Sequence, residues 1–145
     1  MKNAEEKSKI CDIIIESKSV WKNPRTYFLG GILIPRRMEV WYAELPLRDG
    51  SSIQGGKRPV LIVSNDICNE VNSIVTVIPM THQLKGLHLP MHVLIETPDR
   101  GESLVLVEQI TTIDKKQLYN CIGKIRRQDR RIVEAAIREQ LGLKF

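Results

Sequence analysis

Residues 54–63 read Gln54-Gly55-Gly56-Lys57-Arg58-Pro59-Val60-Leu61-Ile62-Val63, and residues 74–81 read Ile74-Val75-Thr76-Val77-Ile78-Pro79-Met80-Thr81. Short apolar runs bounded by glycine, proline and polar residues predict two buried β-strands. Arg58 begins the first strand and Thr81 ends the second, so each strand carries a polar group at one end. The glycine pair lets the backbone approach a ligand closely, and a guanidinium beside a hydroxyl suits the binding of phosphate.

Length and composition predict one globular domain with a hydrophobic core. The chain has 145 residues, of which 42% are hydrophobic and 27% are charged, and these fractions are typical of globular proteins. Its apolar runs are too short to span a membrane, and its N-terminus has no secretory pattern. We therefore expect a cytoplasmic protein with no membrane partner.

The charge distribution permits a polyanionic partner but does not require one. The formal net charge is +5, with a net of +3 in residues 1–36 and +2 in the remainder. A body that is only mildly basic binds nucleic acid through a local patch, if at all. One candidate patch is the cluster of Lys124, Arg126, Arg127, Arg130 and Arg131, which a solvated helix entrance explains equally well.

The three cysteines, Cys11, Cys68 and Cys121, lie far apart in the chain. An odd number at these spacings indicates neither a disulfide framework nor a metal site. We expect them to be reduced and buried, because free cysteine packs as a small hydrophobe.

The chain divides into an N-terminal helical extension, residues 1–36, and a principal domain, residues 37–145. Residues 4–22 have apolar side chains at helical spacing, which predicts an amphipathic helix. Residues 27–35 are expected to form an apolar connection interrupted by two glycines. The extension either packs on the domain or lies across a dimer partner.

The principal domain is predicted to be rich in strands and to end in a helix. Besides the two quoted runs, alternating or apolar segments predict strands at residues 37–45, 91–95, 103–107 and 118–125, with residues 109–114 continuing or kinking out of the fifth. Residues 46–54 read as a loop, and residues 125–141 have helical periodicity. Many short strands and one closing helix favour a small, strongly bent sheet or barrel.

Several segments of the principal domain resemble one known family. They are Val40-Trp41-Tyr42-Ala43-Glu44-Leu45, residues 54–66, Pro79-Met80-Thr81, Leu89-Pro90-Met91-His92-Val93 and residues 108–115. In order and spacing, Arg37 to Phe145 is similar to the MazF/PemK family, the toxins of type II toxin–antitoxin modules. The resemblance implies an α+β fold, a small SH3-like β-barrel with a C-terminal helix, to which this chain adds an extra N-terminal helix.

The resemblance also implies an activity and a set of partners. Family members are sequence-specific endoribonucleases that cleave single-stranded mRNA without a metal or other cofactor. They use the 2′-hydroxyl as the nucleophile and leave 2′,3′-cyclic phosphate and 5′-hydroxyl ends. The implied partners are single-stranded RNA, a cognate antitoxin and a second copy of the chain in a homodimer. Contact with DNA is implied only through the antitoxin.

The family's catalytic arginine and threonine fall on Arg58 and Thr81. The residues that we expect to bind the substrate are Ser52, Gln54, Gly55, Gly56, Lys57, His82 and Gln109. Ile53 and Thr111 stand where relatives often carry a glutamate and a basic residue, so we expect this protein to prefer a different cleavage sequence.

The chemistry of the residues limits the roles that they can take. Cleavage through the 2′-hydroxyl needs proton transfers and stabilisation of an anionic phosphorane. A guanidinium remains charged in neutral solution, so Arg58 suits electrostatic stabilisation better than proton transfer. His82 is the nearest conventional acid–base group, and its position beside Thr81 permits a supporting role.

Other interpretations remain open from the sequence. The pattern alone also fits Arg58 as a solvated strand-edge cation and Thr81 as a simple turn residue. His88 and His92 are expected to be structural, and Trp41 is expected in the core or an interface. The same fold also supports a non-catalytic module, either a gyrase-poisoning relative resembling CcdB or an RNA-binding relative without turnover.

Overall fold

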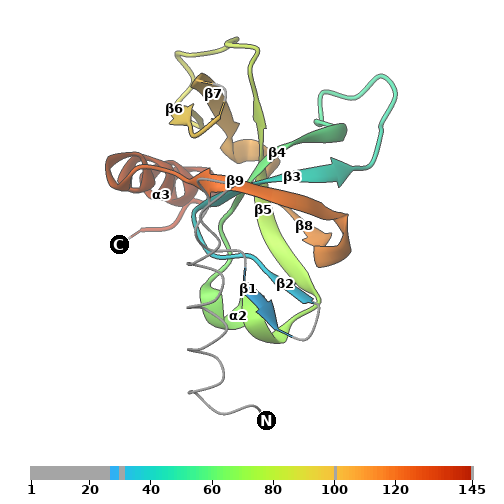
Figure 1. Ribbon diagram of the computed structural model, residues 1–145. Coiled ribbons are helices and arrows are strands. Elements are labelled where there is room, and N and C mark those ends of the chain that lie inside the picture. Colours follow the sequence, from blue (N-terminus) through green and yellow to red (C-terminus); the bar gives the residue numbers. More distant parts are fainter. Residues whose placement is uncertain (1–26, 30–31, 100, 145) are drawn as a thin grey trace.

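A bent antiparallel sheet forms the body of the protein, with a helix packed at one side (Figure 1). The computed structural model describes residues 27–29, 32–99 and 101–144. The helix predicted at residues 4–22 and Cys11 lie outside the described residues. Within the described ranges the sheet has seven strands, in the order β6-β7-β5-β4-β3-β9, with β8 paired to β5.

The bounds of the elements follow the chain from β1 to α3. A two-stranded sheet of β1 (Tyr27–Leu29) and β2 (Ile32–Ile34) precedes the main sheet. The main strands are β3 (Glu39–Leu45), β4 (Gly56–Ile62), β5 (Ile74–Thr81), β6 (His92–Thr97), β7 (Gly101–Leu106), β8 (Thr111–Asp114) and β9 (Leu118–Lys124). The helical elements are α2 (Asp66–Val71), α3 (Arg127–Leu141) and the 3₁₀ turns η1 (Val107–Gln109) and η2 (Lys115–Gln117).

The structure confirms the strands predicted in the principal domain and the C-terminal helix, but some of the segments that connect or precede them differ from the prediction. Residues 109–114 do kink out, because η1 separates β7 from β8 and sends β8 back to pair with β5. The expectation of a plain connection at residues 27–35 is wrong, since Tyr27 pairs with Ile34 across an antiparallel hairpin. The segment between β4 and β5 holds the short helix α2, which Asn65 caps by accepting a hydrogen bond from the Cys68 amide.

Both faces of the sheet are buried, and each carries its own hydrophobic cluster. Successive residues of a strand point to opposite faces, so Val40 belongs to one cluster and its neighbour Trp41 to the other. Val133 and Ala136 of α3 complete the cluster of Val40. Trp41 is fully buried in the second cluster, as a core residue.

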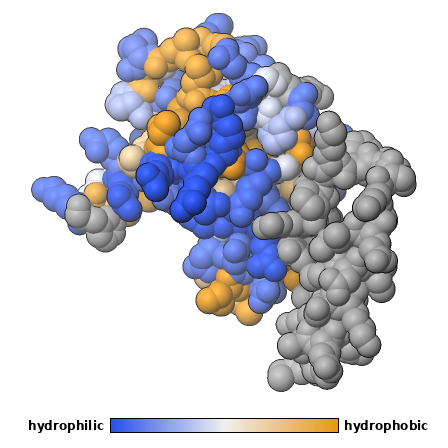
Figure 2. Space-filling view, turned by 60° about the vertical axis from the view of Figure 1, so that its left-hand side comes forward, coloured by the Kyte–Doolittle hydropathy of each residue, from blue (hydrophilic) through white to orange (hydrophobic). Residues whose placement is uncertain are grey.

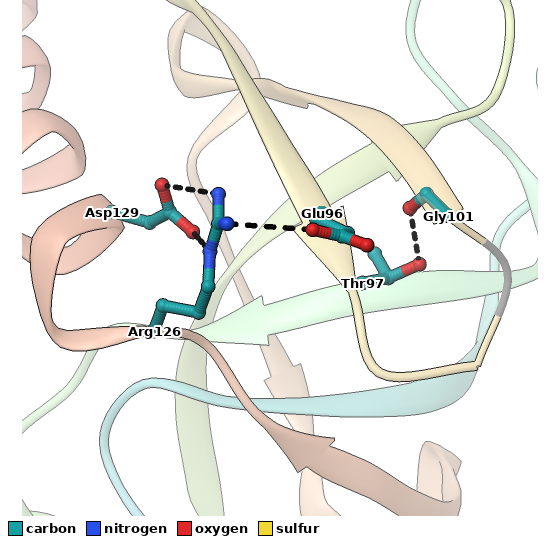
Figure 3. A network of polar contacts seen from close by, with 5 residues as sticks. All are labelled: Glu96, Thr97, Gly101, Arg126 and Asp129. Atoms are coloured by element: carbon teal, nitrogen blue, oxygen red, sulfur yellow. Dashed lines mark hydrogen bonds and ion pairs between the residues drawn. The ribbon is translucent and has the colours of Figure 1, made fainter.

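Side-chain contacts connect the regions of β6 and β9, the two ends of the strand order. Arg126, which follows β9, binds Asp129 at 2.8 Å and Glu96 of β6 at 3.4 Å (Figure 3). Pro98, which follows β6, lies close to Gly123 of β9. A β-carbon on Gly123 would come within 2.7 Å of the Pro98 ring. The expected bent antiparallel sheet with a C-terminal helix is thus confirmed.

The cysteine prediction holds only in part. Cys121 is buried, as expected, but Cys68 is not. Cys68 is half-buried, because it lies on the short surface helix α2 and not on a strand with two covered faces. No helix within the described part of the chain is long and apolar enough to cross a membrane.

Candidate functional site

The register of the sheet brings Arg58 and Thr81 to corresponding positions on neighbouring strands. Val60 of β4 pairs with Pro79 of β5, and continuing this antiparallel register by two residues sets Arg58 opposite Thr81. The β4–β5 pairing ends at Val60 and Pro79, while Thr81 pairs with Leu104 of β7 on the other edge of β5. Pro79 has no N–H to extend the ladder. Arg58 and Thr81 therefore lie where the two strands separate.

The guanidinium of Arg58 is fixed at one nitrogen and open at the others. Nε donates a hydrogen bond to the carbonyl oxygen of Gly55 at 2.9 Å, and the side chain is half-buried. Among the described residues, no acceptor and no carboxylate contacts the Nη atoms of Arg58. The Nη donors can thus bind two oxygens of one phosphate.

Thr81 offers a second hydrogen-bond donor, its side-chain hydroxyl. Its Oγ1 accepts a hydrogen bond from the Gln83 amide at 3.1 Å, which fixes the side chain at the end of β5. A hydroxyl has one proton to donate in addition to its lone pairs. The Thr81 proton is therefore available to an anionic oxygen placed between Thr81 and Arg58.

Five of the predicted binding residues meet in the β3–β4 loop, the start of β4 and the turn beside them. Oε1 of Gln109, in η1, accepts a hydrogen bond from the Gln54 amide at 2.7 Å, and Nε2 donates to the carbonyl of Ser52 at 3.1 Å. Gly55 continues this loop and receives the Arg58 hydrogen bond. Gly56 starts β4 with a positive φ of 76°, a conformation that favours glycine. The loop thus forms one wall beside Arg58.

Lys57 and His82 lie apart from this group. Lys57 adjoins Arg58 in a strand, so its side chain points to the opposite face of the sheet. There its Nζ lies 4.5 Å from the ring centroid of Tyr119. His82 contacts β7 through Nδ1, which lies 2.9 Å from Oγ of the buried Ser103. Their predicted contacts with a substrate at Arg58 stay predictions.

The β5–β6 loop, which follows Thr81, is held by His92. Nδ1 of His92 lies 3.0 Å from the Gly86 carbonyl, and Nε2 lies 2.8 Å from Oε1 of Glu108. His92 is thus structural, as expected. The link to Glu108 could not be found in the sequence, because it depends on the register that pairs His92 with Leu106.

The same loop presents apolar side chains to solvent. Leu84, Leu87 and Leu89 are exposed, and Figure 2 shows apolar surface at the top of the molecule, at the height of the β5–β6 loop, and again at the bottom, at the height of α2. Donors that are able to bind phosphate, flanked by an apolar loop, suit a ligand with both charged and flat apolar parts, such as a nucleic acid strand.

The donors at Arg58 and Thr81 are those that an anionic phosphorane needs. A bidentate guanidinium and a hydroxyl can both strengthen their hydrogen bonds as negative charge develops on non-bridging oxygens. Within the part of the chain that is described, no three His, Cys, Asp or Glu side chains gather into a metal-binding group.

Comparison with known proteins places the chain in a family. The family of the PemK-like, MazF-like toxins of type II toxin–antitoxin systems matches residues 36–141. The chain is 37% identical over 114 residues to endoribonuclease EndoA of Bacillus subtilis strain 168, covering 77% of this chain and 97% of that protein. The chain therefore belongs to the PemK-like, MazF-like toxins. It is an endoribonuclease.

Solved structures agree with this fold. MazF of Deinococcus radiodurans superimposes with a TM-score of 0.66 at 20% identity, covering 75% of this chain and 97% of that one. An endoribonuclease from a mycobacterial species, solved in complex with its cognate antitoxin, gives a TM-score of 0.64 at 23% identity, covering 77% and 98%. These likenesses show that the barrel with its helix is the MazF fold.

Proposed function

We propose that this endoribonuclease toxin cleaves single-stranded mRNA at specific sequences, with the scissile phosphate bound between Arg58 and Thr81. The observation that carries the proposal is the pair of uncommitted donors, the Nη atoms of Arg58 and the hydroxyl of Thr81, at the point where β4 and β5 separate. We also assign residues 37–145 to the toxin domain and residues 1–36 to an extension of it.

In the proposed reaction, the 2′-oxygen of the ribose forms a bond to phosphorus and the bond from phosphorus to the 5′-oxygen breaks. The 2′-hydroxyl loses its proton and the leaving 5′-oxygen gains one, so the products are a 2′,3′-cyclic phosphate and a 5′-hydroxyl. Arg58 binds two phosphate oxygens and Thr81 donates to a non-bridging oxygen. Both interactions gain strength in the phosphorane, which is how they accelerate the step.

The reaction is proposed to need no metal and no cofactor, because the two side chains supply the charge stabilisation themselves. Incubating the full chain with a long RNA in EDTA should give discrete fragments with cyclic-phosphate ends. Arg58→Ala should abolish the fragments. Arg48→Ala is the matched control, because Arg48 is an exposed arginine of the neighbouring loop. Equal cleavage by Arg58→Ala and the unaltered protein would refute the proposed site.

The proposed assembly is a cytoplasmic homodimer that a cognate antitoxin inhibits, with DNA contacted only through that antitoxin. The family supports the antitoxin, and the exposed apolar side chains of the β5–β6 loop and α2 offer surface for protein contacts. An acidic antitoxin segment that covers the surface around Arg58 and Thr81 competes with RNA for the same donors. If a saturating antitoxin left cleavage intact, the competition would be refuted. Sedimentation of the free protein tests the dimer.

A further inference from the structure

We propose that Gln109 is a positioning residue that holds the β3–β4 loop and, through it, the guanidinium of Arg58, and that it does not read an RNA base. The proposal rests on the function proposed for Arg58. Both ends of the Gln109 amide are already bound to the loop backbone, at the Gln54 amide (2.7 Å) and the Ser52 carbonyl (3.1 Å). These contacts use one lone pair of Oε1 and one N–H of Nε2, and together they fix the orientation of the amide toward the loop backbone.

Two hydrogen bonds, joined by the backbone between Gln54 and Gly55, connect Gln109 to Arg58. Gln109 fixes the amide of Gln54, and the carbonyl of the next residue, Gly55, accepts the hydrogen bond from Nε of Arg58 at 2.9 Å. The orientation of that carbonyl therefore depends on the loop position that Gln109 sets. Misplacing a catalytic group by about 1 Å can cost on the order of a hundredfold in rate.

The other end of the path is anchored in the core. Gln109 ends η1, in which Val107 is fully buried and its amide donates to the Met91 carbonyl at 3.1 Å. Glu108 binds His92 at 2.8 Å, and His92 also contacts the Gly86 carbonyl. The turn η1 thus holds both the loop that precedes Arg58 and the loop that follows Thr81.

A double-mutant cycle distinguishes positioning from base reading. Gln109→Met keeps the length of the side chain and removes both hydrogen bonds, whereas Gln109→Glu keeps the acceptor for Gln54 and loses the donor to Ser52. We expect Gln109→Met to lower kcat by roughly tenfold or more, with KM changed by no more than about twofold, and with the same cleavage sequence. In an Arg58→Lys background, where the Nε contact with Gly55 is already absent, Gln109→Met should cause little further loss.

Amide hydrogen exchange gives a readout that does not depend on activity. The Gln54 amide should exchange faster in Gln109→Met, while Gln109→Glu should retain most of its protection. A raised KM with kcat unchanged, an altered fragment pattern, or an equal loss in the Arg58→Lys background would overturn the proposal in favour of a base contact. Unchanged exchange at Gln54 would also overturn it. Full activity of Arg58→Ala would instead refute the proposed site, whatever the exchange result.

Discussion

Gly55 lies so close to Pro46 that a β-carbon on Gly55 would come within 2.6 Å of the Pro46 carbonyl oxygen. The two residues stand at opposite ends of the β3–β4 loop, next to the pairing of Leu45 with Gly56. Since real β-carbons essentially never approach so closely, only glycine lets the loop close in this way. This contact fixes the backbone carbonyl that binds Arg58.

The first prediction concerns Gly55→Ala. The β-carbon must displace backbone atoms, so the loop shifts and the carbonyl no longer meets Nε of Arg58. We expect kcat to fall by about tenfold or more, together with a loss of stability. The control is Gly50→Ala in the same loop, where a β-carbon has open space but φ is 69°, so it should cost about 1–2 kcal/mol of backbone strain and leave kcat unchanged. Cleavage rates and urea midpoints of both variants test this. Normal activity in Gly55→Ala would contradict the role of the contact.

The second prediction concerns the shape of the cation at residue 58. Arg58→Lys keeps the positive charge but loses both the Nε anchor and the bidentate fork. We expect a loss of about 3 kcal/mol in transition-state stabilisation, or roughly a hundredfold in kcat. Single-turnover cleavage at saturating RNA measures it. If lysine supports nearly full activity, net charge and not geometry is the contribution of Arg58.

The third prediction concerns the hydroxyl of Thr81. Thr81→Val keeps the branched shape and removes the proton that is free to bind the phosphate. We expect kcat to fall by tens to hundreds of fold, while Thr81→Ser, which keeps the hydroxyl, retains most of the activity. Equal rates for the valine and serine variants would show that Thr81 only shapes the turn.

The strands could be predicted from the sequence because their residues alternate or form short apolar runs with clear boundaries. The α2 helix could not, since its six residues are too few for a periodic signal. The β1–β2 hairpin was missed for a similar reason, because two strands of three residues around a glycine pair read as an irregular connection.

The site was predictable only to the level of residue type. Strand ends placed Arg58 and Thr81 near each other, and the family resemblance supplied their roles. The separation of Lys57 from Arg58 follows from strand alternation, but only once residue 57 is known to lie inside β4. The two hydrogen bonds of Gln109 join residues that are 55 and 57 positions apart in the sequence, so no local sequence pattern predicts them.

The fourth prediction concerns Glu39, a carboxyl buried at the start of β3. Burial raises the pKa of Glu39, although hydrogen bonds from Arg36 and Trp41 act in the opposite direction. A raised pKa means that the contribution of Glu39 to the free energy of unfolding is complete below the pKa of the unfolded chain, about 4.3. That contribution is lost as the pH rises through the pKa of the folded protein. At neutral pH the buried charge therefore lowers the free energy of unfolding.

Glu39→Gln tests this, because both hydrogen bonds reach a single oxygen, Oε2, which a glutamine carbonyl can replace. The variant should unfold at higher temperature than the unaltered protein at neutral pH, and the difference should shrink toward about pH 4. Glu39→Leu is the contrast, since it leaves the Trp41 N–H without its acceptor and should be less stable than Glu39→Gln by about 1–3 kcal/mol at every pH. A difference between Glu39→Gln and the unaltered protein that does not change with pH would contradict the prediction.

The fifth prediction concerns Met38, which has a positive φ of 69° although it is not a glycine. The Glu39 amide donates to the Arg36 carbonyl at 3.1 Å, so Met38 occupies the third position of a tight turn, where a positive φ is characteristic of type II geometry. Its side chain is fully buried in the core cluster of Val40. Burial of the side chain thus offsets a strained backbone, which costs about 1–3 kcal/mol at such a position.

The two contributions can be separated by comparing Met38→Ala with Met38→Gly. Both variants lose the buried side chain, for which a methionine-to-alanine change costs about 2–5 kcal/mol. Only glycine also relieves the positive φ, so Met38→Gly should be more stable than Met38→Ala by about 1–2 kcal/mol. This reverses the order found at most positions, where glycine destabilises because it gains backbone freedom in the unfolded chain. Urea unfolding of the two variants measures the difference. An alanine variant as stable as the glycine variant would mean that the strain relieved at residue 38 does not exceed the stability that glycine loses through backbone freedom in the unfolded chain, and this would contradict the prediction.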